Sequence, residues 1–219
     1  VALGALAAAF LEQAAGVRLV SHTVAIGPVA VPEGASLPSA DDLAALDAEV
    51  GSRSFAADLT SEADVAALAA HVASTGDVHA LVHVAGGARG TDRVEDGSPE
   101  DWRWMFEANV LSTQLVTAAL LPLLRGGIRA GGGHADTLYV TSTAAQTAYP
   151  GGAGYNAAKA GEAMLVHALR LELNGEPIRV TEVAPGMVHT PEFTLNRLGG
   201  DRASAERVYD GVESPLVAS

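Results

Sequence analysis

The stretch TLYVTSTAAQTAYPGGAGYNAAK, residues 137–159, decides the fold of this chain. Its first five residues are apolar, aromatic or β-branched and predict a strand. Its small residues and glycines predict a loop, and its last part begins a helix that is expected to reach about Leu173. Because residues four apart lie on one helix face, Tyr155 and Lys159 are predicted to point into the same space. The stretch therefore predicts a strand–loop–helix unit that brings a phenol, an ammonium group and the Ser142 hydroxyl together.

Tyr155 and Lys159 have the chemistry of a tuned acid–base pair. A phenol has an ordinary pKa of about 10, and a neighbouring ammonium group favours the phenolate and lowers that pKa. The Ser142 hydroxyl could steer a carbonyl oxygen. A Tyr-x-x-x-Lys pair also arises often by chance, at an ordinary helix start with a solvated lysine. The surrounding sequence has to decide between these two interpretations.

Strands and helices alternate along the rest of the chain. Strands are predicted at 17–20, 79–84, 137–141 and 178–183, with a weaker one at 52–57, and helices at 3–15, from 41 or 42 to 50, 60–74, 99–124, 155–173 and around 203–209. This alternation predicts an α/β fold with a doubly wound parallel sheet. Thr60 is expected to cap the helix that follows it, and Ser98 with Pro99 to start the longest helix. That helix is too long to be straight, since Pro122 lies near its end.

The predicted strands end in residues suited to ligand binding. Ligands of open α/β sheets bind beyond the carboxyl ends of the strands. Those ends carry Asp58, Ala85-Gly86, Ser142 and Pro185-Gly186. Their convergence with Tyr155 favours a functional site over a chance pair.

Composition limits the classes of partner. Acidic residues outnumber basic ones by 26 to 13, which gives a formal charge of −13 and opposes binding to nucleic acid or to anionic membrane surfaces. No apolar run was expected to span a membrane. The chain has no cysteine, which is compatible with the cytoplasm, and its seven histidines show no zinc-binding spacing, so no metal is expected.

The motifs together resemble the short-chain dehydrogenase/reductase family. Ser142, Tyr155 thirteen residues later, and Lys159 look like the catalytic signature of that family. Four further matches support the resemblance, and they are Asn109 in a helix, Asp58-Leu59, Ala85-Gly86, and the segment Pro185-Gly186-Met-Val-His-Thr190. The match covers the chain from about residue 3 to residue 216.

The resemblance implies a Rossmann-like fold and reversible hydride transfer between a nicotinamide cofactor and a secondary alcohol or ketone. In this family pattern Tyr155 exchanges the proton, and Lys159 lowers the Tyr155 pKa and binds the ribose. Ser142 orients the substrate oxygen, and Asn109 holds a water that links Lys159 to solvent. Asn109 is also compatible with a buried amide that bends its helix. The residues expected to hold the cofactor are Gly4, Asp58, Leu59, Ala85, Gly86, Tyr155, Lys159, Pro185, Gly186, Val188 and Thr190. Asp58 is equally compatible with a loop acid that caps a helix.

A narrower resemblance concerns the substrate. Trp102-Arg-Trp-Met, the segment that begins at Arg179, and Arg197-x-x-Gly200-Asp201 are similar to the branch that oxidises serine and other 3-hydroxy acids. This similarity implies NADP rather than NAD. Arg197 could bind a substrate carboxylate, although a solvated loop arginine explains it as well.

The chain departs from the family pattern in four places. The first strand and most of the phosphate-binding loop would precede Gly4, and a last helix and strand would follow residue 219. Asn-Asn-Ala-Gly is replaced by His83-Val-Ala-Gly86, and Ser21-His-Thr23 carries neither of the residues that select NAD or NADP. We therefore expect one domain, residues 1–219, that lacks its first and last strands because the sequence is an incomplete stretch of a longer protein.

Three functional classes stay open on these grounds. The first is the oxidoreductase. The second is a nucleotide-binding module without turnover, and the third is a scaffold subunit whose long helices serve assembly. The family commonly pairs such helices between subunits, so a homodimer or homotetramer is expected.

Overall fold

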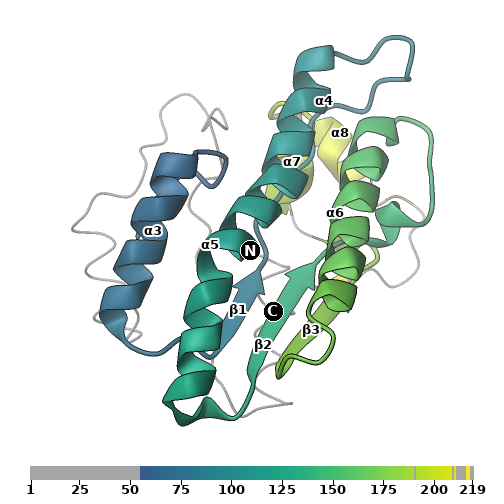
Figure 1. The fold of residues 1–219 in the computed structure, drawn as a ribbon. Coiled ribbons are helices and arrows are strands. Elements are labelled where there is room, and N and C mark those ends of the chain that lie inside the picture. The colour runs from purple at the N-terminus through teal and green to yellow at the C-terminus, as the bar shows by residue number, and fades with distance from the viewer. Residues whose placement is uncertain (1–54, 190, 209, 211–215, 218–219) are drawn as a thin grey trace.

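The computed structural model describes residues 55–189, 191–208, 210, 216 and 217 (Figure 1). Its centre is a parallel sheet of three strands, β1 (Ala80–His83), β2 (Ala135–Val140) and β3 (Ile178–Val183), in the order β1-β2-β3. The helices α5 (Ser112–Gly127) and α6 (Ala153–Glu172) lie over one face of this sheet, with α3 (Glu62–Thr75) beside α5. The predicted α/β class with a Rossmann-like parallel sheet is confirmed.

The central strand explains the order of the sheet. β2 is buried along almost its whole length, as expected of a parallel strand that has neighbours on both edges and is covered by helices. Its register sets Leu138 opposite Val82 on one side and Thr181 on the other. All three strands therefore end at the same edge of the sheet, where β2 leads directly to Ser142.

The start of α3 corrects one predicted cap. Ser61 is the N-cap, because its hydroxyl accepts a hydrogen bond from the Asp64 backbone N–H. Thr60, the predicted cap, instead donates its hydroxyl to Asp58 Oδ1 at 2.7 Å. Residues 55–57, the described part of the weak strand predicted at 52–57, are not in a strand. Ser98 does cap α4 (Pro99–Phe106), as predicted.

The long helix predicted at 99–124 is not one regular α-helix. It is interrupted by the π-helical turn η1 (Glu107–Leu111), whereas Pro122 lies inside α5. The helix also runs on past its predicted end at 124, through the end of α5 into η2 (Ile128–Gly132). Gly127 permits this, because a Cβ there would collide with the carbonyl oxygen of Val78 at the entry to β1.

The segment Pro99–Gly131 also corrects the expectation about apolar runs. With 33 residues and a mean hydropathy of 1.2 in its most apolar window, it is long and apolar enough to cross a membrane by length and composition alone. In the structure its α5 part packs on β1, β2 and α3. Val116, Leu120 and Leu124 enter the main hydrophobic core there. Such packing is that of a core helix in an α/β domain.

The tail after β3 contains short elements. The helices α7 (Pro191–Arg197) and α8 (Arg202–Arg207) follow a two-residue strand, β4 (Val188–His189), which pairs in parallel with β5 (Leu216–Val217). The predicted tail helix at 203–209 corresponds to α8, and α7 was not predicted. The elements predicted before residue 55 lie outside the described residues.

Candidate active site

Tyr155 and Lys159 lie in the first two turns of α6, as predicted from their spacing. Only 7% of Tyr155 and 2% of Lys159 is exposed, so neither is the solvated side chain of an ordinary helix start. Ser142 follows β2 and begins the 3₁₀ turn Thr143–Ala145, where its oxygen accepts a hydrogen bond from the Ala144 backbone N–H. The structure therefore brings the three predicted catalytic residues to one end of the sheet.

The loop that carries Ser142 is held by a residue that the sequence analysis missed. The Asn156 amide donates to the carbonyl oxygens of Ala144 at 2.6 Å and Thr147 at 3.0 Å. The Thr143 backbone N–H donates to the Pro185 carbonyl oxygen at 2.9 Å. These bonds fix Ser142 between α6 and the segment after β3.

Burial dominates the electrostatics of Tyr155. Desolvation raises the pKa of its phenol, while the Lys159 ammonium group and a hydrogen bond with Ser142 lower it. Tyr149 and Glu162 raise the Tyr155 pKa further. The expected direction of the Lys159 effect is right, but the overall shift is upward. The expectation of a lowered pKa left out the loss of hydration, which disfavours the phenolate.

Lys159 has a partner that the sequence analysis did not identify. Its Nζ donates to Glu162 Oε2 at 2.6 Å and to the Val140 carbonyl oxygen at 3.2 Å. Glu162 is fully buried. The spacing of three residues on one helix was the signal available in the sequence. Two of the three N–H donors of the ammonium group are used by these bonds, and one remains for a further acceptor.

Asn109 lies in the π-helical turn η1 and is completely buried. Its Nδ2 donates to the carbonyl oxygens of Met105 at 2.6 Å and Gly87 at 2.9 Å, and its Oδ1 accepts from the Gly87 N–H at 3.1 Å. The amide thus clamps the loop after β1 onto the helix. A Cβ on Gly86 would lie 2.5 Å from Asn109 Oδ1 and 3.2 Å from Lys159 Nζ, which explains the glycine at this position.

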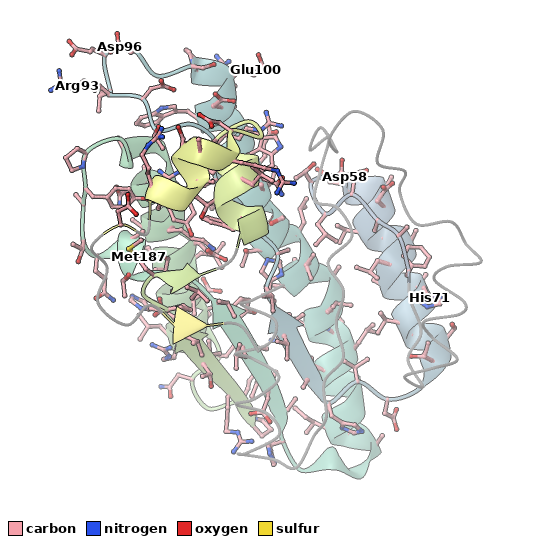
Figure 2. All side chains as sticks on the ribbon, turned by 180° about the vertical axis from the view of Figure 1, so that it is seen from behind. Asp58, His71, Arg93, Asp96, Glu100 and Met187 are labelled. Carbon is pink, nitrogen blue, oxygen red and sulfur yellow. The ribbon has the colours of Figure 1, made fainter. Side chains whose placement is uncertain are left out.

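Of the residues predicted to hold the cofactor, Ala85 and Gly86 follow β1, and Pro185 and Gly186 follow β3. In Figure 2, Asp58 lies at the start of α3 and Met187, in the segment after β3, lies on the other side of the molecule. Asp58 Oδ1 accepts from the Thr60 N–H at 2.9 Å, which is the helix-start role left open above.

The remaining predicted cofactor residues differ in accessibility. Leu59 packs against the main core, Ala85 and Gly86 are half-buried after β1, and Gly186 is exposed with open space around it. Val188 lies in β4. Gly4 and Thr190 lie outside the described residues.

Arg197 reaches the site from α7. Its guanidinium donates to the carbonyl oxygens of Gly90 at 3.0 Å and Gly151 at 3.2 Å and to the Tyr149 hydroxyl at 2.8 Å. Its Cζ lies 5.5 Å from the centre of the Tyr155 ring. Arg197, which is predicted to bind a substrate carboxylate, therefore lies next to Tyr155, the proposed proton donor. It also connects α7 to two loops. A hollow beside it is lined by residues that include Gly90, Trp102, Met105 and Tyr155.

The described residues contain no group of three or more His, Asp or Glu side chains that could hold a metal ion. His83 occupies the position of the first asparagine in the family motif. Its Nε2 lies 2.9 Å from the Thr113 hydroxyl oxygen, within hydrogen-bonding distance. Burial and the Lys159 charge lower the His83 pKa from 6.5 to about 3.

Comparison with known proteins agrees with this geometry. The family model described as short chain dehydrogenase matches residues 34–197, which is more than half of the chain. An uncharacterized oxidoreductase of Mycobacterium tuberculosis is 48% identical over 180 residues, covering 82% of this chain and 68% of the relative. Serine 3-dehydrogenase of Rhizobium radiobacter is 38% identical over 184 residues, which cover 82% of this chain and 70% of that relative.

A solved structure extends the likeness to three dimensions. The closed form of serine dehydrogenase complexed with NADP⁺ matches with a TM-score of 0.72 at 30% identity, over 82% of this chain and 71% of that one. Family model, relatives and structural neighbour agree on one class of enzyme acting on small molecules with a nicotinamide cofactor. The chain belongs to the short-chain dehydrogenase/reductase family and is an NAD(P)-dependent oxidoreductase.

Proposed function

We propose that this protein transfers a hydride between NADP and the 3-position of a 3-hydroxy acid or its 3-oxo counterpart, with Tyr155 as general acid and base. The observation that carries the proposal is the burial of the Tyr155 phenol beside Lys159 and Ser142. A buried phenol whose ionisation is opposed by desolvation and favoured by a cation is arranged to exchange a proton with a ligand. Such an arrangement is common at functional sites and rare on a solvated helix start.

Each side chain has one task in this mechanism. The Tyr155 hydroxyl gives its proton to the carbonyl oxygen during reduction and takes it back during oxidation. Lys159 favours the phenolate that remains after reduction. Ser142 donates a hydrogen bond to the substrate oxygen and holds it at a fixed distance from Tyr155. The nicotinamide, when bound, supplies or accepts the hydride.

The described residues fit a nicotinamide cofactor at the ends of the strands. The third N–H of Lys159 is available to a ribose hydroxyl. Gly86 lets the loop after β1 lie close to Asn109 and Lys159, and the open space at Gly186 leaves room for a ligand after β3. NADP is chosen over NAD because the serine dehydrogenase neighbour was solved with NADP⁺.

The class of substrate follows from Arg197 and from the serine dehydrogenase relatives. A guanidinium 5.5 Å from the Tyr155 ring could exchange one of its carbonyl partners for a carboxylate, to which it would bind more strongly. A 3-hydroxy acid places its carboxylate two carbons from the reacting carbon. Serine, the substrate named for the relatives, is such an acid.

Turnover of NADPH and NADH with a panel of simple ketones and 3-oxo acids tests the function. We expect the wild-type protein to oxidise NADPH with a 3-oxo acid, and Tyr155→Phe to lower kcat by roughly 10²–10⁴-fold because it removes the exchangeable proton. Tyr139→Phe is the matched control, since it deletes a buried phenol hydroxyl that bonds Thr117 in the core and should keep turnover.

Two other results would select the competing classes. Cofactor binding without turnover by the wild-type protein and by Tyr155→Phe would favour a nucleotide-binding module. Binding of neither cofactor would favour a scaffold. Retention of full turnover by Tyr155→Phe would refute the role of Tyr155 itself.

A homodimer or homotetramer and a cytoplasmic location belong to the same proposal. The large apolar side chains Phe106 and Leu111 before α5, and Met164 and Leu171 on α6, are exposed at 54%, 36%, 65% and 78%. Pairing of these surfaces between subunits would cover them. Sedimentation analysis of the protein tests this, and a monomer at micromolar concentration would contradict it. The absence of cysteine suits a reducing compartment.

A further inference from the structure

Glu162 is a buried carboxylate that the mechanism above does not use. It lies on α6 three residues after Lys159, and its side chain is completely inaccessible to solvent. A buried carboxylate loses its hydration, so it persists in the ionised form only where partners replace the lost water. Burial raises the pKa of the Glu162 carboxyl, and its partners Lys159 and Thr113 oppose that shift from two sides.

The partners of Glu162 come from two helices, and one of them also contacts a strand. Oε2 accepts the hydrogen bond from Lys159 Nζ at 2.6 Å, and Oε1 accepts one from the Thr113 hydroxyl at 3.3 Å. The Thr113 oxygen in turn lies 2.9 Å from His83 Nε2 and 2.7 Å from the Asn109 carbonyl oxygen. A continuous chain of polar contacts therefore connects β1 to the ammonium group beside Tyr155.

The hydrogens of this chain can be assigned by counting. The Thr113 hydroxyl has one proton, which its two oxygen acceptors, on Glu162 and Asn109, already share. With Glu162 ionised, His83 donates through Nε2–H and accepts nothing from Thr113. A neutral ring with this tautomer agrees with the lowered His83 pKa. The chain therefore supplies donors to the Glu162 carboxylate and no competing positive charge besides Lys159.

Stability alone is a weak reason for this arrangement. Removal of two charges from water costs about as much as their attraction returns, and a buried pair can often be replaced by apolar residues without loss. The pair does have a consequence at Tyr155. The ammonium group favours the phenolate, and the carboxylate beside it opposes the phenolate by its own charge.

We propose that Glu162 is a positioning residue for Lys159, and that its negative charge, by offsetting the ammonium charge at Tyr155, sets the pH range in which Tyr155 exchanges its proton. The proposal rests on the proposed function, because it concerns the proton that Tyr155 transfers. The charged and titratable groups that act on Glu162 are Lys159 and Tyr155 on α6, His83 of β1 through Thr113, and Glu182 of β3. Glu182 is itself bonded to Thr141 and His167.

The decisive experiment titrates Tyr155 directly, without turnover. Tyrosinate formation is followed by ultraviolet difference absorbance in the wild-type protein, in Glu162→Gln and in Glu162→Asp, and Tyr155→Phe versions of each identify the Tyr155 signal by subtraction. Gln keeps the volume and a hydrogen-bond acceptor but removes the charge. Asp keeps the charge on a side chain shorter by one methylene.

We expect Glu162→Gln to lower the Tyr155 pKa by about one pH unit, because the ammonium charge is then no longer offset. In Glu162→Asp the Tyr155 pKa should lie closer to its value in the wild-type protein than to its value in Glu162→Gln. The pH at which the rate of alcohol oxidation rises should be lower in Glu162→Gln by the same number of pH units. A role confined to packing would instead damage the Asp variant more than the Gln variant and would leave both pH profiles in place.

An unchanged or raised Tyr155 pKa in Glu162→Gln would overturn the proposal. If that variant does not fold, the carboxyl carbon resonance of Glu162 in the wild-type protein decides, assigned by its loss in Glu162→Asp. An ionised carboxylate at neutral pH is required, and a neutral acid refutes the proposal. The proposed function fails separately, through full turnover by Tyr155→Phe, so the two failures are distinguishable.

Discussion

Two ion pairs of equal length lie at opposite ends of the sheet. Lys159 Nζ and Glu162 Oε2 are 2.6 Å apart beyond the carboxyl ends of the strands, and Arg125 Nη2 and Glu176 Oε1 are 2.6 Å apart near the start of β3. The side chains of the first pair are 3% and 0% exposed, and those of the second are 38% and 35% exposed. Distance therefore does not distinguish the two pairs, and their surroundings do.

The surroundings decide how far each charge acts. Water screens the Arg125–Glu176 pair, so its two charges affect little beyond each other. The buried pair lies in a medium of low polarity, where each charge reaches Tyr155. The same chemical contact is thus a surface link at one end of the sheet and a control on proton transfer at the other.

The largest expected effect comes from breaking the buried pair. Lys159→Met leaves the Glu162 carboxylate without a cation, which should lower the free energy of unfolding by about 3–5 kcal/mol. Chemical denaturation measures this change. The double variant Lys159→Met/Glu162→Met should recover most of the stability, because it removes both charges, and should remain without turnover. A double variant no more stable than the single one would show that packing, and not the unpaired charge, causes the loss.

Near neutral pH a smaller effect is expected from His83, and it grows as the pH falls. Burial holds its pKa near 3, while the unfolded chain binds that proton below about 6.5. Below pH 6.5 the unfolded state therefore binds more protons, and stability is lost as the pH falls toward 3, with a slope of up to about 1.4 kcal/mol per pH unit. His83→Gln, which keeps a donor for Thr113, should lack this contribution.

The measurement is the difference in unfolding free energy between the wild-type protein and His83→Gln across that pH range. His79→Gln is the matched control, because His79 is an exposed histidine just before the same strand. A difference curve for His83 that does not change as the pH falls from 6.5 toward 3 would contradict the burial argument.

The smallest effect is expected at the exposed end of the sheet. Arg125→Gln removes one partner of a pair that water already screens, so its loss of stability should be a small fraction of that of Lys159→Met. The loss should shrink further in high salt. Denaturation at two salt concentrations measures both. A salt-independent loss as large as that of Lys159→Met would mean that exposure does not govern these two pairs.

Local rules predicted the elements that depend on neighbouring residues. Ser98 caps α4 and Tyr155 shares a helix face with Lys159, because a cap and a helical spacing involve only a few consecutive positions. Such rules failed where a distant contact competes. The Asn109 side chain bonds the Gly87 backbone, and the long helix is interrupted at η1, whereas Pro122 lies inside α5. The extent of the domain, residues 1–219, stays a prediction.

The sequence by itself determined the α/β class and the family, and it identified Ser142, Tyr155 and Lys159, because fixed spacing on a strand, loop and helix specifies which side chains can meet. Only the tertiary structure decided that Lys159 is held by Glu162 and that the Tyr155 pKa is raised. Those properties depend on how much water is excluded from α6 by the sheet, η1 and α4. Exclusion of water is produced by packing among segments distant in sequence, so no local pattern could state it in advance.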